Sequence, residues 1–189
     1  MVSSSTIEVP HLGGIKAGYA LSDNKYDPTK PTVVMVNSMC TTVALYKDQF
    51  EDKKLAEAVN MLAIEPLGHG ATSSPVEHFT YWDAAIMALQ VMDKLGIKSA
   101  FALGTSQGGW IVVRMALLMP EKVCHLLFFH GMTVSHMVLQ DPGSSSIRNV
   151  NGLRVRRIAR PRCLGTRCSH STICRELDIK DGNSGIRGR

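Results

Sequence analysis

A serine flanked by glycines is the residue of this sequence best suited to covalent chemistry. Ser106 lies in the run Gly104-Thr105-Ser106-Gln107-Gly108-Gly109, between an apolar segment and a helical pattern. In a G-x-S-x-G turn the nucleophile stands on a tight, strained bend, so the residues two before and two after it must be small. The helix dipole and the free N–H of Gln107 would favour negative charge beside it. The pattern predicts a nucleophilic serine that attacks acyl carbonyls.

Other glycine-rich turns are distinguished from this one by the residues around the serine. A phosphate-binding P-loop needs a lysine after the glycine, but Gly108 is followed by Gly109 and Trp110. A dinucleotide fingerprint needs G-x-G-x-x-G, which Thr105 and Ser106 interrupt. A plain strand-to-helix turn without chemistry remains the alternative.

The elements that must position this serine alternate between strands and helices. Apolar runs without polar alternation predict strands buried on both faces, as in a parallel sheet, at residues 32–37, 60–64 and 99–103, with 123–129 a possible fourth. Helical patterns cover residues 46–58, 80–95 and 107–119. Thr80 and Asp83 fit a capping box, and residues 4–22 predict one or two antiparallel edge strands. This alternation indicates an α/β domain with a mostly parallel sheet and flanking helices.

Three linked motifs within residues 4–122 resemble the α/β-hydrolase superfamily. Val36-Asn37-Ser38-Met39 follows the first buried strand, where the family usually has His-Gly-X. The run from Glu65 to Ser74 is similar to the family's Asp-x-x-Gly-His-Gly-x-Ser turn, and the third motif is the serine turn. The resemblance implies that the backbone N–H groups of Met39 and Gln107 hold the oxyanion. It also implies that His69 is structural, and not the general base.

The resemblance implies a serine hydrolase of esterase or lipase type that acts on an ester or other acyl small molecule. The sequence is similar to fungal esterase/lipase-like hydrolases of secondary-metabolite clusters, including those that make toxins. No metal, organic cofactor, nucleic-acid partner or membrane span is expected, and the oligomeric state stays open. A cytoplasmic location is expected, with the peroxisome as the alternative, although Arg187-Gly188-Arg189 is no peroxisomal tripeptide.

A serine nucleophile also needs a base and an acid to orient it, and in this fold both come later in the chain. The formal candidates are Asp141 as the acid and His170 as the base. Further histidines flank the possible fourth strand, at His125, His130 and His136. None follows a clear buried strand. We therefore expect this chain to be poorly stable and weakly active or inactive. The alternative function is a catalytically inactive α/β-hydrolase-like protein, either a truncated product or a binding module.

The composition changes within the chain. Residues 1–122 hold nine Lys, one Arg and twelve acidic residues, whereas 123–189 hold one Lys, ten Arg and four acidic residues. A reading-frame change near Val123 would explain the switch, which yields the hypothesis of a truncated or frameshifted hydrolase. We expect residues 1–130 to form the N-terminal part of the domain and 131–189 to be an irregular, disordered tail rich in Arg, Ser and Cys.

Two other interpretations of the tail are weaker. Arginines between Arg154 and Arg162 could bind nucleic acid, but no aromatic residue accompanies them for base stacking. A zinc site would use a set of four possible ligands: Cys163, Cys168, His170 and Cys174. Their spacing is not that of a zinc finger or knuckle.

Overall fold

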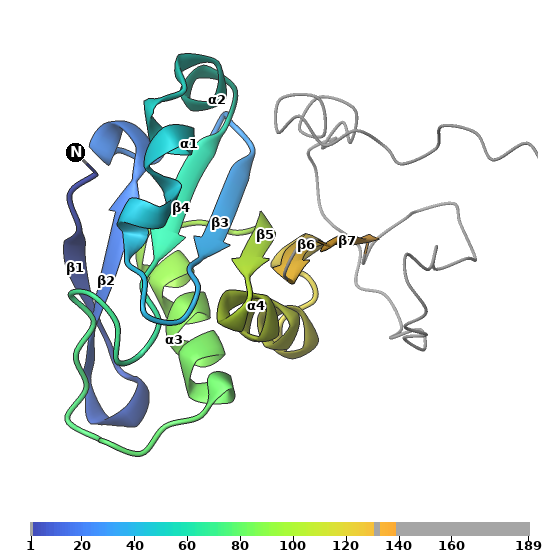
Figure 1. Cartoon of the computed structure of the whole chain (residues 1–189). Helices are drawn as coiled ribbons and strands as arrows, with labels where there is room; N and C mark the ends of the chain where they lie inside the picture. Colours follow the sequence, from blue (N-terminus) through green and yellow to red (C-terminus); the bar gives the residue numbers. More distant parts are fainter. Residues whose placement is uncertain (1, 131–132, 139–189) are drawn as a thin grey trace, which may run out of the picture.

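A seven-stranded mixed sheet organises the chain (Figure 1). The computed structural model describes residues 2–130 and 133–138. The strands are β1 (Ser5–Val9), β2 (Ile15–Leu21), β3 (Thr32–Val36), β4 (Asn60–Ile64), β5 (Ala100–Thr105), β6 (Val123–His130) and β7 (Thr133–Val138). Their order across the sheet is β1-β2-β4-β3-β5-β6-β7. The four central strands β4, β3, β5 and β6 are parallel, and the strands at both edges are antiparallel to their neighbours. The predicted fold class is confirmed.

The central strands are buried on both faces, as their unbroken apolar runs predict. Every residue of β3 and β4 is buried. Val34 and Leu62 point to the face covered by α3 (Tyr81–Lys94) and α4 (Gln107–Leu118). Val33 and Met61 point to the other face, where Tyr46 and Leu55 cover the sheet. Two apolar clusters thus sandwich the sheet, and the strand period of two assigns neighbouring residues to opposite clusters.

The predicted single helix over 46–58 is wrong, because it is broken in the middle. The segment forms the 3-10 turn η3 (Val43–Tyr46) and two short helices, α1 (Lys47–Glu51) and α2 (Lys53–Ala58). Asp52 between the helices is extended, and its carboxylate accepts hydrogen bonds from the N–H groups of Lys54 and Leu55. Aspartate is favoured at such a cap and disfavoured inside a helix, which explains the break.

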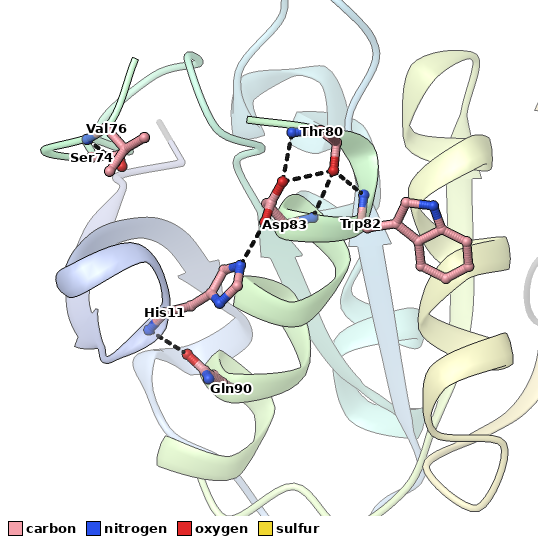
Figure 2. A network of polar contacts seen from close by, with 7 residues as sticks. All are labelled: His11, Ser74, Val76, Thr80, Trp82, Asp83 and Gln90. Carbon is pink, nitrogen blue, oxygen red and sulfur yellow. Dashed lines mark hydrogen bonds and ion pairs between the residues drawn. The ribbon is translucent and has the colours of Figure 1, made fainter. Parts of the chain in front are cut away.

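The predicted capping box at the start of α3 is confirmed, and its carboxylate also contacts the turn between β1 and β2. Thr80 Oγ1 accepts from the N–H of Asp83, while Asp83 Oδ2 accepts from the N–H of Thr80. Figure 2 shows that the same carboxylate also contacts His11, with 2.9 Å between Oδ1 and Nε2. His11 belongs to η1 (His11–Gly13), the 3-10 turn between β1 and β2, and its N–H donates to Gln90 in α3. The β1–β2 turn is therefore fastened to α3 at two points.

The sheet continues past the predicted domain boundary. The possible fourth strand is present as β6, and Val123, Leu126 and Leu127 on it are buried. Strand β7 follows and pairs with β6, although it falls in the segment 131–189 that the sequence predicts to be irregular. The remaining element of the described residues is the 3-10 turn η2 (Ser22–Asn24), which follows β2. Residues 139–189 lie outside the described part of the chain.

Candidate active site

The serine turn has the geometry that its sequence predicts. Ser106 lies between β5 and α4 with φ 51° and ψ −110°, a left-handed conformation that is strained for a residue with a side chain. Its side chain is exposed. Although Ser106 is the N-cap residue of α4, its hydroxyl makes no capping hydrogen bond. The turn therefore presents the hydroxyl to solvent without using it to complete the helix.

Two glycines allow the chain to turn this tightly. A Cβ atom at Gly104 would overlap the backbone of Gly108 across the turn. A Cβ at Gly108 would overlap the carbonyl oxygen of Val36, the last residue of β3. The N-terminus of α4 thus packs directly against the end of β3, from which the loop with Met39 departs. The small residues of the motif are required by contact between two backbones.

The sequence predicts two backbone donors for an oxyanion, the N–H groups of Met39 and Gln107. Gln107 is the first residue of α4, so its N–H has no acceptor inside the helix. Met39 lies in the loop after β3, and its side chain is 61% exposed. The loop is ordered by Asn37, which is fully buried and donates through Nδ2 to the carbonyl oxygens of Ser38 and Thr41. Asn37 thus organises the loop where the family pattern has histidine.

The turn after β4 braces this loop from the other side. His69 Nε2 accepts the N–H of Cys40 at 3.1 Å, and its Nδ1 lies 3.0 Å from the carbonyl oxygen of Leu67. The buried Glu65 accepts from the N–H of Val43 through Oε1 and from the N–H of Ala71 through Oε2. Ser4 Oγ also donates to Glu65 Oε2. The second sequence motif therefore supports the first, which is the structural role expected of His69.

Tyr46 links the elements that surround the serine turn, and sequence reasoning missed it. Its hydroxyl donates to the carbonyl oxygen of Val36 at 2.9 Å and lies 3.3 Å from Thr105 Oγ1, next to the nucleophile candidate. Burial raises the pKa of Tyr46 to about 12, while the hydrogen bond with Thr105 opposes that shift. Sequence reasoning misses this hydroxyl because Tyr46 lies in an amphipathic pattern, where a tyrosine also fits as an ordinary core residue.

Three of the described histidines, His11, His69 and His125, make contacts away from the serine turn. His125 is buried in β6 and stacks on Phe101, with 4.8 Å between the ring centroids. Both ring nitrogens of His69 are engaged, and His11 contacts Asp83. Ser106 forms no hydrogen bond with His11, His69 or His125. His130 and His136 lie in β6 and β7, whereas the candidates Asp141 and His170 lie outside the described residues.

Two features are absent from the part of the chain that the structure covers: a cluster of metal ligands and a membrane-spanning helix. Within it, no cluster of three or more His, Cys, Asp or Glu side chains could hold a metal ion. Its helices are all too short or too polar to cross a bilayer. The zinc ligand set centred on Cys163 and Cys168 lies outside the described residues, and so does the arginine cluster.

Comparison with known proteins shows the family. The model of the family described as the α/β hydrolase fold matches residues 31–143. A 2-heptyl-3-hydroxy-4-quinolone dioxygenase, AqdC1 of Rhodococcus erythropolis, is 26% identical over 113 residues, which are 58% of this chain and 40% of that protein. The 3-oxoadipate enol-lactonase 2 of Acinetobacter baylyi is 27% identical over 96 residues, 49% of this chain and 34% of that protein.

A solved structure shows the same relationship in three dimensions. The crystal structure of a hydrolase from Pseudomonas aeruginosa aligns with a TM-score of 0.57 and 27% identity, covering 66% of this chain and 44% of that one. The chain belongs to the α/β hydrolase fold family. It spans less than half the length of these relatives. They include a dioxygenase and a lactonase, so membership alone does not fix the reaction.

Proposed function

We propose that the protein is a hydrolase that attacks an ester or other acyl carbonyl with Ser106. The observation that supports this function best is the exposed, unbonded hydroxyl on the strained turn between β5 and α4. Strain of this kind is stored where the surrounding structure enforces it, and the backbone of Val36 and the glycines enforce it here. The N–H groups of Met39 and Gln107 would hold the oxygen of the tetrahedral intermediate.

The reaction would proceed in two steps. Ser106 Oγ forms a bond to the carbonyl carbon and loses its proton to a general base. The carbonyl bond re-forms as the alcohol leaves, giving an acyl-serine that water hydrolyses. In this reaction Ser106 would be the nucleophile, and Met39 and Gln107 would be the oxyanion donors. The base and its orienting acid remain unassigned. Small-molecule esters are the proposed substrates, with fungal secondary metabolism as the proposed setting.

A non-catalytic member of the family is the second candidate function. The occupied nitrogens of His69 favour it, because this histidine of the three motifs has no free nitrogen to accept the serine proton. Without a base, Ser106 stays a neutral hydroxyl. A serine hydrolase stripped of triad members retains roughly 10³–10⁴-fold acceleration over water, from its oxyanion hole and binding.

Covalent labelling of the full chain separates the two functions. A fluorophosphonate is incubated with the protein and with Ser106→Ala, and the modified residue is mapped by mass spectrometry. The hydrolase proposal expects stoichiometric labelling of Ser106 within minutes and none in the variant. Equal, slow labelling of both proteins would reject the hydrolase and support a binding role.

A further inference from the structure

The two peptide groups on either side of Met39 are each held by side chains. The carbonyl oxygen of Ser38 accepts from Asn37 Nδ2 at 3.2 Å, from the N–H of Thr41 at 3.3 Å and from Thr41 Oγ1 at 2.8 Å. A trans peptide is planar, and its C=O and N–H point in opposite directions. Fixing the carbonyl of Ser38 therefore also fixes the direction of the Met39 N–H, away from Asn37 and Thr41.

The next peptide group is held from the turn after β4. A backbone amide can only donate, so His69 Nε2 must be the acceptor for the N–H of Cys40. The ring is then neutral, with its proton on Nδ1, from which it donates to the carbonyl oxygen of Leu67. Cys40 itself has φ 59°, a conformation that a side chain disfavours. The imidazole thus stabilises a backbone orientation that the residue would not choose by itself.

Asn37 supports the first of these two peptide groups, at the carbonyl of Ser38. It is fully buried, and its Nδ2 also contacts Thr41 Oγ1 at 3.2 Å and the carbonyl oxygen of Thr41 at 2.7 Å. Its Oδ1 has no hydrogen-bond partner in the described part of the structure, which costs stability in a buried amide. All hydrogen bonds of the Asn37 side chain in the described structure are therefore donated to the loop that carries Met39.

We propose that Asn37, Thr41 and His69 are positioning residues that fix the Met39 N–H as an oxyanion donor before substrate arrives. This inference rests on the proposed function, and it adds which side chains orient the Met39 N–H in that site. A donor that is already oriented needs no reorganisation when negative charge develops on the substrate oxygen. The loop lacks the His-Gly pair of the family pattern, and the side-chain amide of Asn37 with the hydroxyl of Thr41 replaces that support.

Two matched pairs of variants test the inference in the full chain. Thr41→Val removes the hydroxyl and keeps the shape, whereas Thr41→Ser keeps the hydroxyl. His69→Leu removes both hydrogen bonds, whereas His69→Gln retains one donor and one acceptor. Each protein reacts with a fluorophosphonate, in which the Ser106 Oγ–P bond forms, P–F breaks, fluoride leaves and the hydroxyl proton passes to solvent. The phosphoryl oxygen then stands where the oxyanion would.

The maximal labelling rate and the half-saturating probe concentration are measured separately. We expect Thr41→Val and His69→Leu to lower the maximal rate about tenfold or more, a fraction of the ~10²–10³-fold effect of deleting an oxyanion donor. The half-saturating concentration should stay unchanged, and Thr41→Ser and His69→Gln should keep rates within about threefold of the wild type. Wild-type rates in Thr41→Val and His69→Leu would overturn the inference.

Amide hydrogen exchange separates this inference from the proposed function. Exchange of the Cys40 and Thr41 amides is followed by NMR in proteins that have not reacted with the fluorophosphonate. The dispersion of the spectrum checks that each protein is folded. If wild-type Ser106 is not labelled, the proposed function fails, and exchange alone decides the positioning role of Thr41 and His69. Faster exchange at both amides in Thr41→Val and His69→Leu, but not in the conservative partners, supports the positioning. Unchanged exchange overturns it.

Discussion

Gly108 lies so close to the carbonyl oxygen of Val36 that no side chain fits between the start of α4 and the end of β3. This contact places the serine turn beside the loop that begins at Asn37. The distance between Ser106 and the loop that carries Met39 is thus set by two backbones, and not by side-chain packing.

Gly108→Ala should therefore disturb the site as well as the fold. Because the added methyl meets backbone, α4 must move, and we expect a loss of about 2–4 kcal/mol in the free energy of unfolding. Urea unfolding measures this loss, and fluorophosphonate labelling of Ser106 should slow at least tenfold. The control is Gly96→Ala, where φ is 74° but nothing lies within 4 Å of an added Cβ. It should cost about 1 kcal/mol and leave labelling unchanged. Equal effects of both variants would contradict the backbone contact.

Tyr46→Phe tests the buried hydroxyl next to the turn. Phenylalanine cannot donate to the carbonyl oxygen of Val36, and loss of this buried hydrogen bond should cost about 1 kcal/mol at pH 7. The pKa of Tyr46 is raised from 10.0 to about 12, so its stabilising contribution is complete below pH 10 and is lost as the pH rises through 12. The stability difference between wild type and Tyr46→Phe should shrink over that window. Urea unfolding at a series of pH values measures it, and a constant difference up to pH 12 would contradict the assignment.

Glu65→Gln should be among the most destabilising conservative substitutions. The buried carboxylate accepts from Ser4, Val43 and Ala71, and a glutamine amide would turn an N–H₂ group toward one of these donors. Losing charge-assisted hydrogen bonds and burying an unpaired donor should cost about 2–4 kcal/mol. Glu57→Gln, at an exposed position in α2, is the matched control and should stay within about 0.5 kcal/mol of wild type. Chemical denaturation distinguishes the two variants.

Thr80→Val removes the cap of α3 and should destabilise the protein by about 1 kcal/mol at neutral pH. The Thr80 hydroxyl is the main cause of the lowered pKa of Asp83, followed by the Thr80 amide and then His11. A lowered pKa gives stability above the ordinary carboxyl range, and this stability is lost as the pH falls through the folded-state value. Below about pH 4 the difference in stability between the wild type and Thr80→Val should therefore become smaller.

Ser74→Ala serves as the control for Thr80→Val. Ser74 also caps a local turn, through Val76, but it has no carboxylate partner (Figure 2). The loss of stability in Ser74→Ala should be small and should not change between pH 7 and pH 3. Thermal unfolding at both values compares the variants, and a pH-independent deficit of Thr80→Val would refute the link to Asp83.

Local signals predicted most of the framework. The apolar run of β4 predicted a doubly buried strand, and Thr80 with Asp83 defined the start of α3 within one residue. The position of Ser106 between strand and helix is confirmed as well, while its role as nucleophile stays a prediction. In each case, the deciding interactions lie within a few residues along the chain.

The missed features depend on contacts between distant segments. The bond between Cys40 and His69, and that between Tyr46 and Thr105, join residues with no shared pattern in sequence. Asn37 looked like a departure from the family pattern, yet its amide supports the loop by contacts that the pattern does not encode. The break at Asp52 is different, because an aspartate at this position is itself a local signal for a helix start. The amphipathic pattern over residues 46–58 nevertheless predicted one continuous helix.

The guanidinium of Arg114 lies over the rings of Trp82 and Trp110, 5.1 Å and 6.0 Å from their centroids. These are the two tryptophans of the chain, both are substantially exposed, and they come from α3 and α4. The intrinsic fluorescence of the protein therefore arises from one spot, at the seam between the helix that begins at the serine turn and its neighbour. An emission shift will therefore report changes where α3 meets α4, and optical melting curves need a second probe in the strands to follow the sheet.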